Sequence, residues 1–322
     1  MGDSKACQFS YVLDGAGGGM PFDPWAGGAP ETRLAWLHLN GRHSDTRKFL
    51  KDHLHLDQMV VKSLLAEETR PRIEEFGGGM LLILRGLHFN PGPQPEDLVS
   101  IRLWISPSRI ISVGRRKARA IADIDERIRQ GRGAKRLGEF IAQLCTSLLD
   151  GIEPTLDEME ELANKMEGIS PDAAGHGLRD ELAAIRKQAI IFRRHVSPQR
   201  DVISRLRHSD QFDMTAADQW AMQDSYDRIT RFIEDLDVLR ERSLILQDEL
   251  HSALSGRLNK NLYILSVITA IFMPLTFLSG LLGMNVAGIP QADNPKSFIV
   301  VCGVIFIVGV LQLLLFRRLK WV

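Results

Sequence analysis

Two long apolar runs near the end of the 322-residue chain constrain its fold more than any other feature. The first, Leu262–Leu282, contains no charged residue, and the second, Phe298–Phe316, is of similar length and also uncharged. A helix of about 21 residues would be roughly 31 Å long, which matches a bilayer hydrocarbon core of about 30 Å. Because uncharged runs of this length are rare in soluble proteins, we predict two transmembrane helices rather than two buried helices of a soluble core.

The charges that flank the two runs predict their orientation. Between the runs the only basic residue is Lys296, whereas five basic residues lie on their other side: Arg257, Lys260, Arg317, Arg318 and Lys320. Positive charge favours the cytoplasmic side of a membrane. The first residues also lack the basic and apolar regions of a signal peptide. We therefore expect a multi-pass membrane protein, with both termini in the cytoplasm and the connecting loop outside.

The composition excludes several other classes of function. Lys and Arg together number 40, as do Asp and Glu, so no net basic charge favours nucleic-acid binding. The three cysteines, Cys7, Cys145 and Cys302, are far apart and form no cluster with histidine, which argues against a disulfide framework and a structural zinc finger. No spacing pairs a nucleophile with a base, so we expect neither an enzyme nor a bound cofactor.

The first 130 or so residues mix strands with helices. Val, Ile, Leu and Trp content predicts strands over 34–40, 80–89, 98–106 and 109–114, and helices are expected over 44–56 and 58–68. The Pro-rich segment 90–97 is expected to be a hairpin tip. The predicted fold is an α+β cytoplasmic domain, in which helices flank a β-sheet, followed by a long stalk helix and two transmembrane helices.

The chain is expected to have seven parts. These are a cytoplasmic α/β domain over 1–132, antiparallel helices over 133–214, a stalk helix over 215–261, transmembrane helices over 262–282 and 298–317, an external loop over 283–297 and a cytoplasmic tail over 318–322.

The first apolar run has one face on which most residues are small or hydroxylated. Steps of three and four residues place on this face Leu262, Ser266, Thr269, Met273, Thr276, Gly280 and Gly283. Such a stripe is equally typical of close helix packing and of a pore lining. Two features favour the pore: Pro274 leaves the Ala270 carbonyl without its helical donor, which water can satisfy, and the stripe leads to Asn285.

A single helix cannot enclose a pore, so this hypothesis requires several copies of the chain. Just before the first run, a 3-4 spacing joins eight residues: Ile229, Phe232, Leu236, Leu239, Ser243, Leu246, Leu250 and Ala253. One continuous helix from about Thr215 to about Leu282 would present this seam to other copies. The alternative is that the seam packs within a bundle of the same chain.

The tripeptide Gly283-Met284-Asn285 resembles the Gly-x-Asn signature of the CorA family of divalent-cation transporters, because it stands between two C-terminal apolar runs after "IFMPLTFLSGLL". Other segments resemble the zinc-transporting ZntB branch of that family and cover nearly the whole chain: "YVLDGAGG", "WLHLN", "EETRPRI", "LLILRG", "PQRDVISRL", "GIP" and "LKWV". Met284 departs from that branch and resembles the magnesium channels.

The resemblance implies a funnel-shaped homopentamer in the bilayer, with the first transmembrane helix of each copy lining the pore and Gly283, Met284 and Asn285 at its external entrance. It implies zinc as the transported ion, linked to protons, with cadmium, nickel, cobalt and magnesium as further candidates. A ring of Asn285 amides would accept hydrogen bonds from the waters of a hydrated ion, and Asp293 would attract cations weakly.

Three alternatives stay open on the residues alone. Zinc prefers thiolate, imidazole and carboxylate ligands, and the stripe offers none, so the pore chemistry does not separate zinc from a CorA-type magnesium or cobalt channel. A membrane-anchored scaffold or sensor would use the hairpin only as a tether. The acidic residues of 153–161 are expected to be a solvated helix face, with a weak regulatory cation site as the alternative.

Overall fold

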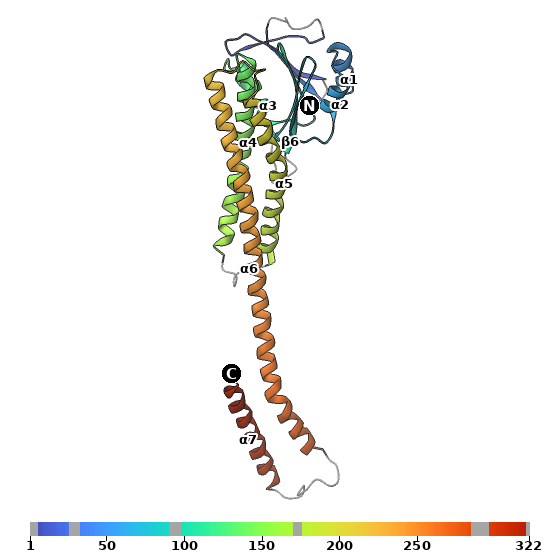
Figure 1. Ribbon diagram of the computed structural model, residues 1–322. Coiled ribbons are helices and arrows are strands. Elements are labelled where there is room, and N and C mark those ends of the chain that lie inside the picture. Colours follow the sequence, from blue (N-terminus) through green and yellow to red (C-terminus); the bar gives the residue numbers. More distant parts are fainter. Residues whose placement is uncertain (1–5, 26–32, 90–97, 170–175, 285–295, 320–322) are drawn as a thin grey trace. The chain divides into compact units, whose positions relative to one another are not determined.

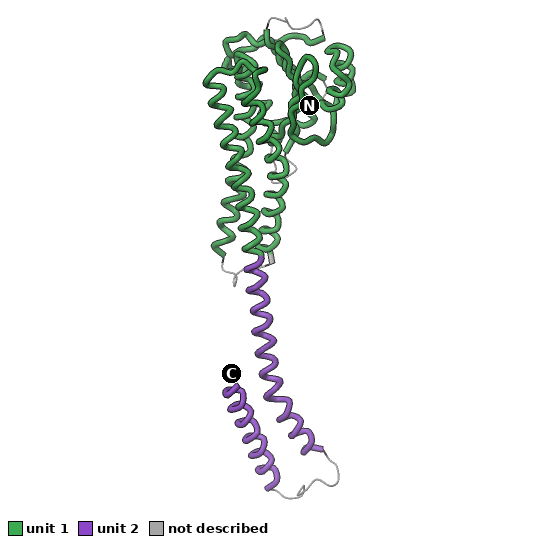
Figure 2. The backbone as a smooth tube through the Cα atoms, viewed as in Figure 1, with its two compact units in different colours: residues 1–247 green, residues 248–322 purple. Residues whose placement is uncertain are grey.

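The computed structural model describes residues 6–25, 33–89, 98–169, 176–284 and 296–319, and the chain divides into two compact units, 1–247 and 248–322 (Figure 2). The elements in chain order are β1 (Cys7–Leu13), β2 (Gly19–Pro21), β3 (Ala35–Asn40), α1 (Ser44–Lys48), η1 (Phe49–His53, a π-helical turn), α2 (Gln58–Leu65), β4 (Arg72–Phe76), β5 (Gly79–Leu87), β6 (Leu98–Ser106), β7 (Arg109–Gly114), α3 (Arg119–Arg129), α4 (Leu137–Glu167), α5 (His176–Arg207), α6 (Ala216–Leu282) and α7 (Ser297–Arg318) (Figure 1).

The first unit is built on a seven-stranded mixed sheet in the order β2-β1-β3-β7-β6-β5-β4. Strands β3 and β7 pair in parallel, and the other neighbours pair antiparallel. All six residues of β3 are buried, because both faces of the sheet are covered there, and this explains its nearly continuous apolar sequence. The strands predicted at 34–40, 80–89, 98–106 and 109–114 are confirmed as β3, β5, β6 and β7.

Helices cover both faces of this sheet (Figure 1). On one face, Phe49 of η1 and Val60 and Leu64 of α2 pack with the strand residues Leu37 and Ile83 in one hydrophobic cluster. On the other face, side chains of α3 and α4 join the alternate strand residues in a larger cluster that continues into the helical bundle. The central strands β3, β5, β6 and β7 therefore contribute residues to two separate cores, one on each face of the sheet.

Some elements were not predicted from the sequence. Strands β1, β2 and β4 and helix α3 are absent from the prediction, and the helix expected over 44–56 is instead α1 followed by η1, which ends at His53. Strand β4 forms the edge of the sheet, and its sequence "RIEEF" is mostly charged, which suits an exposed edge but hides the strand. The expected hairpin tip at 90–97 lies outside the described residues, and β5 and β6 on either side of it pair antiparallel.

Helices α4, α5 and the first half of α6 form a bundle below the sheet, as predicted, and α6 confirms the expected long helix. The first half of the seam on α6 is not available for contact with other copies of the chain. Ile229, Leu236 and Ser243 are fully buried within the first unit, in a hydrophobic core that α4 and α5 share. The assembly hypothesis for this part of the seam is therefore wrong, and the bundle alternative is correct. Heptad spacing reports that a helix face is covered, but not by which chain.

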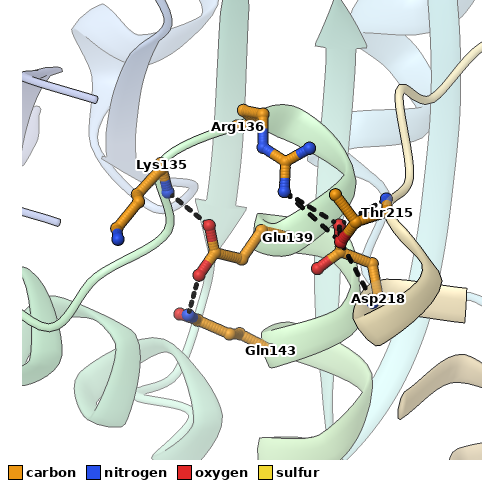
Figure 3. A network of polar contacts seen from close by, with 6 residues as sticks. All are labelled: Lys135, Arg136, Glu139, Gln143, Thr215 and Asp218. Atoms are coloured by element: carbon orange, nitrogen blue, oxygen red, sulfur yellow. Dashed lines mark hydrogen bonds and ion pairs between the residues drawn. The ribbon is translucent and has the colours of Figure 1, made fainter. Parts of the chain in front are cut away.

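A polar network joins the start of α4 to the start of α6 (Figure 3). Asp218 accepts hydrogen bonds from the Thr215 backbone N–H at 2.8 Å and from the Thr215 hydroxyl at 2.6 Å, and Arg136 lies 3.2 Å from the same carboxylate. A Thr and an acid three residues later cap the free N–H groups of a helix start, which typically stabilises a helix by about 1 kcal/mol. Because Asp218 is buried, this contact also fixes where the long helix begins.

Buried His38 on β3 makes folding sensitive to acid. Its Nδ1 lies 2.8 Å from the Ser112 hydroxyl, and burial lowers its pKa from 6.5 to about 4. The unfolded chain binds a proton at this ring below about pH 6.5 while the folded chain does not, so stability falls as the pH drops from 6.5 towards 4. At pH 5 the loss relative to neutral pH is about 2 kcal/mol.

We expect the His38→Gln variant to lack the loss of folding stability that protonation of His38 causes between neutral pH and pH 5. The measurement is denaturant unfolding of the purified protein at pH 7 and pH 5, followed by tryptophan fluorescence. The variant keeps the contribution of His195, whose pKa is also lowered by burial, so part of the pH dependence persists. An equal loss of stability in wild type and variant would show that His38 does not titrate in this range.

Candidate functional site

The second unit contains the predicted membrane hairpin. Helices α6 and α7 are the two described helices that are long and apolar enough to span a membrane. Helix α7 lies beside α6 in this unit (Figure 1), and a Cβ atom added to Gly309 would lie 3.8 Å from Leu275 Cδ1. The side chains of both helices are otherwise largely exposed in a single copy of the chain, as expected for helices that face lipid or other copies.

The predicted stripe on α6 lies on the side away from α7. Between Leu262 and Met284, the partly covered residues of α6 are Val267, Ala270, Ile271, Leu275 and Leu278. The stripe residues are all exposed: Leu262, Ser266, Thr269, Met273, Thr276 and Gly280. At 3.6 residues per turn, the mean directions of the two sets differ by roughly 160°. Packing against α7 therefore does not explain the small and hydroxylated residues of the stripe.

Two hydroxyl groups of the stripe, those of Ser266 and Thr269, are hydrogen-bonded to their own helix. Ser266 Oγ donates to the Leu262 carbonyl and Thr269 Oγ1 donates to the Leu265 carbonyl, each at 2.8 Å. A hydroxyl has one proton and two acceptor lone pairs. Because the proton is used within the helix, the outward side of each hydroxyl offers only lone pairs. A row of acceptors suits the hydrogen atoms of water around a cation better than those around an anion.

Ser279 provides a further hydroxyl group, which is not part of the predicted stripe. Its Oγ donates to the Thr276 carbonyl at 3.0 Å, in the last turns of α6. Helical spacing places Ser279 beside the stripe rather than on it, which is why the strict 3-4 pattern passed over it. Nothing lies within 4 Å of a Cβ atom added to Gly280, so this position leaves open space on the stripe.

The structure describes only the first two residues, Gly283 and Met284, of the predicted external entrance. Gly283 closes α6 with a hydrogen bond from its N–H to the Ser279 carbonyl at 3.0 Å, and Met284 beyond it is exposed. The predicted entrance residue Asn285 and the weak cation ligand Asp293 lie outside the described residues. Their roles stay predictions, as does the role of the pore-lining stripe.

The acidic face of α4 is partly neutralised by basic residues. Arg228 of α6 lies 2.9 Å from Asp150 and 2.6 Å from Glu153, and Lys165 lies 2.8 Å from Glu161. The described residues contain no group of three or more His, Cys, Asp or Glu side chains placed to hold a metal ion. The contacts therefore favour an ion-paired helix face over the regulatory cation site that was the alternative.

Comparisons with known proteins agree with the resemblance seen in the sequence. The family model "CorA-like Mg2+ transporter protein" matches residues 31–318. The divalent cation transporter CmaX of Pseudomonas aeruginosa is 36% identical over 99% of this chain and 98% of its own length, and the zinc transport protein ZntB of Yersinia enterocolitica is 33% identical over 97% of this chain and 95% of its own. The solved structure of full-length CmaX matches with a TM-score of 0.84 and 33% identity, covering 99% of both chains.

These matches span the sheet, the bundle and both apolar helices, so they concern the whole architecture and not only the tripeptide. Members of the family are transporters and not enzymes, which agrees with the absence of a nucleophile-base pairing in the sequence. The chain belongs to the CorA-like family of divalent-cation transporters.

Proposed function

We propose that the protein carries zinc, together with protons, across the cell inner membrane through a pore formed by five copies of the chain. Both termini lie in the cytoplasm, and the loop with Gly283, Met284 and Asn285 forms the external entrance. The stripe of Leu262, Ser266, Thr269, Met273, Thr276 and Gly280 lines the pore.

The observation that carries this proposal is the direction of the stripe. Helix α7 packs on the opposite side of α6, so the stripe is available to line an axis shared by several copies. The bulky residues of the other faces are suited to lipid and to α7. A helix that served only to anchor the chain would gain nothing from hydroxyl and glycine residues gathered on one exposed face.

The entrance would recognise an ion with its water still bound. Stripping water from a divalent ion for neutral amides is costly, whereas Asn285 amide oxygens can accept hydrogen bonds from first-shell waters. Such weak binding lets the ion leave again, which transport requires. The identity of the ion rests on the similarity to the zinc transport proteins ZntB.

A magnesium or cobalt channel is the second candidate. The family model that matches the chain is described as a Mg2+ transporter, and Met284 resembles the signature of the magnesium channels. The stripe contains no thiolate, imidazole or carboxylate that would favour zinc. Cadmium, nickel and cobalt are further ions to which a filter for hydrated cations would be open.

The proposal is tested by measuring uptake of radioactive zinc and magnesium into proteoliposomes, with and without a pH gradient. We expect zinc to enter faster than magnesium and to enter faster still when the gradient is present. Protein-free liposomes provide the control for leak. Zinc uptake that ignores the gradient would disprove the link to protons, and magnesium uptake faster than zinc uptake would favour the magnesium channel.

A further inference from the structure

The first unit contains a large cavity with an unusual excess of positive charge. Its volume is about 1180 Å3, and it lies where β5 and β6, the segment after α2 and helix α5 come together. Eight arginines and one histidine line it, against two glutamates. This charge plays no part in the proposed cation pathway, because every lining residue belongs to the first unit.

Two of the arginines are built into the sheet itself. Strands β5 and β6 pair so that Arg85 lies opposite Ser100, which places Arg85 and Arg102 as diagonal neighbours on one face. Arg102 is only 2% exposed, and its guanidinium donates to the Ala66 carbonyl at 2.8 Å. Arg85 donates to the carbonyls of Leu98 at 3.0 Å and Thr69 at 2.8 Å.

These contacts leave some N–H groups of the two guanidinium groups without an acceptor, and they do not balance the positive charge. The buried Nε atoms of Arg85 and Arg102 have no hydrogen-bond partner among the described residues. Carbonyl oxygens accept hydrogen bonds but do not cancel a positive charge. Glu67 is already paired with Arg115 at 2.7 Å. Glu68 offsets only part of the effect of burial on Arg85, whose pKa stays lowered. A buried donor without a partner is costly, and a buried guanidinium without a counter-charge is more so.

The pKa values report the same accumulation of positive charge. Burial, and then the nearby charges of Arg85 and Arg115, lower the pKa of Arg102 to about 10. Burial, followed by Arg85, Arg194 and Arg70, lowers the pKa of His195 to about 4. His195 Nδ1 is also buried without a hydrogen-bond partner within the described part of the chain. A neighbouring anion would relieve both effects.

The rim of the cavity provides further donors. Arg70 and Arg194 line it, are exposed, and form no ion pair with any described residue. They come from the segment after α2 and from α5. A ligand held by both would connect α5 to the sheet.

We propose that this cavity binds a soluble anion that carries several phosphate groups, such as a nucleoside triphosphate or inorganic tripolyphosphate. A guanidinium donates two parallel hydrogen bonds to a phosphate and keeps its charge at every physiological pH. A single phosphate would engage a few of the eight arginines, whereas a chain of phosphates reaches those of the sheet and of the rim. The volume suits a ligand of nucleotide size, and Leu98, Val99 and Ile191 provide apolar contacts.

The test is isothermal titration of the purified full-length protein with sodium tripolyphosphate and with ATP, in EDTA and at constant ionic strength. We expect saturable binding of one anion per chain and an increase in the thermal unfolding temperature. Arg194→Glu and Arg70→Glu alter exposed side chains and are expected to fold, and each should weaken binding by about tenfold or more. Equal affinity for the two probes would show that the phosphates suffice, and tighter binding of ATP would show that the nucleoside contributes.

Arg179→Glu is the matched control. It lies on α5 as Arg194 does, is exposed, and lies outside the cavity lining, about 22 Å further along the helix at 1.5 Å per residue. The affinity of the Arg179→Glu variant for tripolyphosphate and for ATP should equal that of wild type. Absence of binding, or an equal loss in all three variants, would overturn the proposal.

A further variant tests whether carboxylates of the chain itself neutralise the arginines of the cavity. Glu96 and Asp97 directly precede Leu98 in the sequence and lie outside the described residues. In a variant with Glu96→Gln and Asp97→Asn, we expect binding as tight as in wild type or tighter. Binding that occurs only in this variant would overturn the proposal, because it would mean that the chain's own carboxylates occupy the cavity.

Discussion

Replacing Asn285 by alanine is expected to abolish metal flux. Every copy in the assembly would lose its amide at once, so the entrance would no longer accept hydrogen bonds from the waters of an arriving ion. Substitution of outer-shell partners of a metal typically reduces affinity by 10–100-fold, and we expect a loss of flux of about 100-fold, at the upper end of that range. The measurement is uptake of radioactive zinc and magnesium into proteoliposomes.

Asn294→Ala is the matched control, because it removes an identical side chain from the same predicted external loop but leaves the Gly-Met-Asn signature intact. Its flux should remain close to that of wild type. The oligomeric state of both variants is measured by size-exclusion chromatography with light scattering, which separates a lost entrance from a lost assembly. Normal uptake in an assembled Asn285→Ala variant would show that this amide is not the filter.

Cysteines placed on the stripe are expected to make transport sensitive to a membrane-impermeant, positively charged thiol reagent. In a background without Cys7, Cys145 and Cys302 that still transports, we introduce Thr269→Cys and Thr276→Cys in turn. Modification would place a bulky cation in the pore of every copy, and flux should fall on the order of tenfold or more. The thiol should also react faster when water fills the pore than when lipid surrounds it.

The matched positions are Leu275→Cys and Leu278→Cys, which lie within one turn of Thr276 but on the side of α6 that faces α7. We expect these variants to keep their flux after treatment with the reagent. If the leucine positions react and the threonine positions do not, the stripe faces lipid or protein, and the proposed pore lies on the wrong face of the helix.

The long elements could be predicted from the sequence because each depends on a pattern within one segment. The uncharged run Leu262–Leu282 and the regular spacing before it predict α6 almost to the residue. Strand β4 could not be predicted in this way, because an edge strand tolerates charge and its pattern resembles that of a loop. The seam on α6 failed for another reason: covered faces look alike whether the neighbour belongs to the same chain or to another.

The arginine-lined cavity could not be predicted either. Arg70, Arg102 and Arg194 come from three segments far apart in the sequence, and only the pairing of β5 with β6 and the packing of α5 bring them together. Each arginine alone resembles an ordinary surface residue. The candidate pore is the opposite case, because its residues come from one helix turn after another.

The hydrogen bonds from the Ser266 and Thr269 hydroxyls to their own helix have a consequence for the proposed link between metal and protons. From Leu262 to Leu282 the stripe contains no carboxylate, imidazole or amine, and the helix backbone holds the hydroxyl protons of Ser266 and Thr269. Such a wall offers no titratable side chain that could take up a proton and pass it on. In a pore lined by this stripe, protons would cross along the water column itself, and the step that ties them to the metal would take place at one of its two ends.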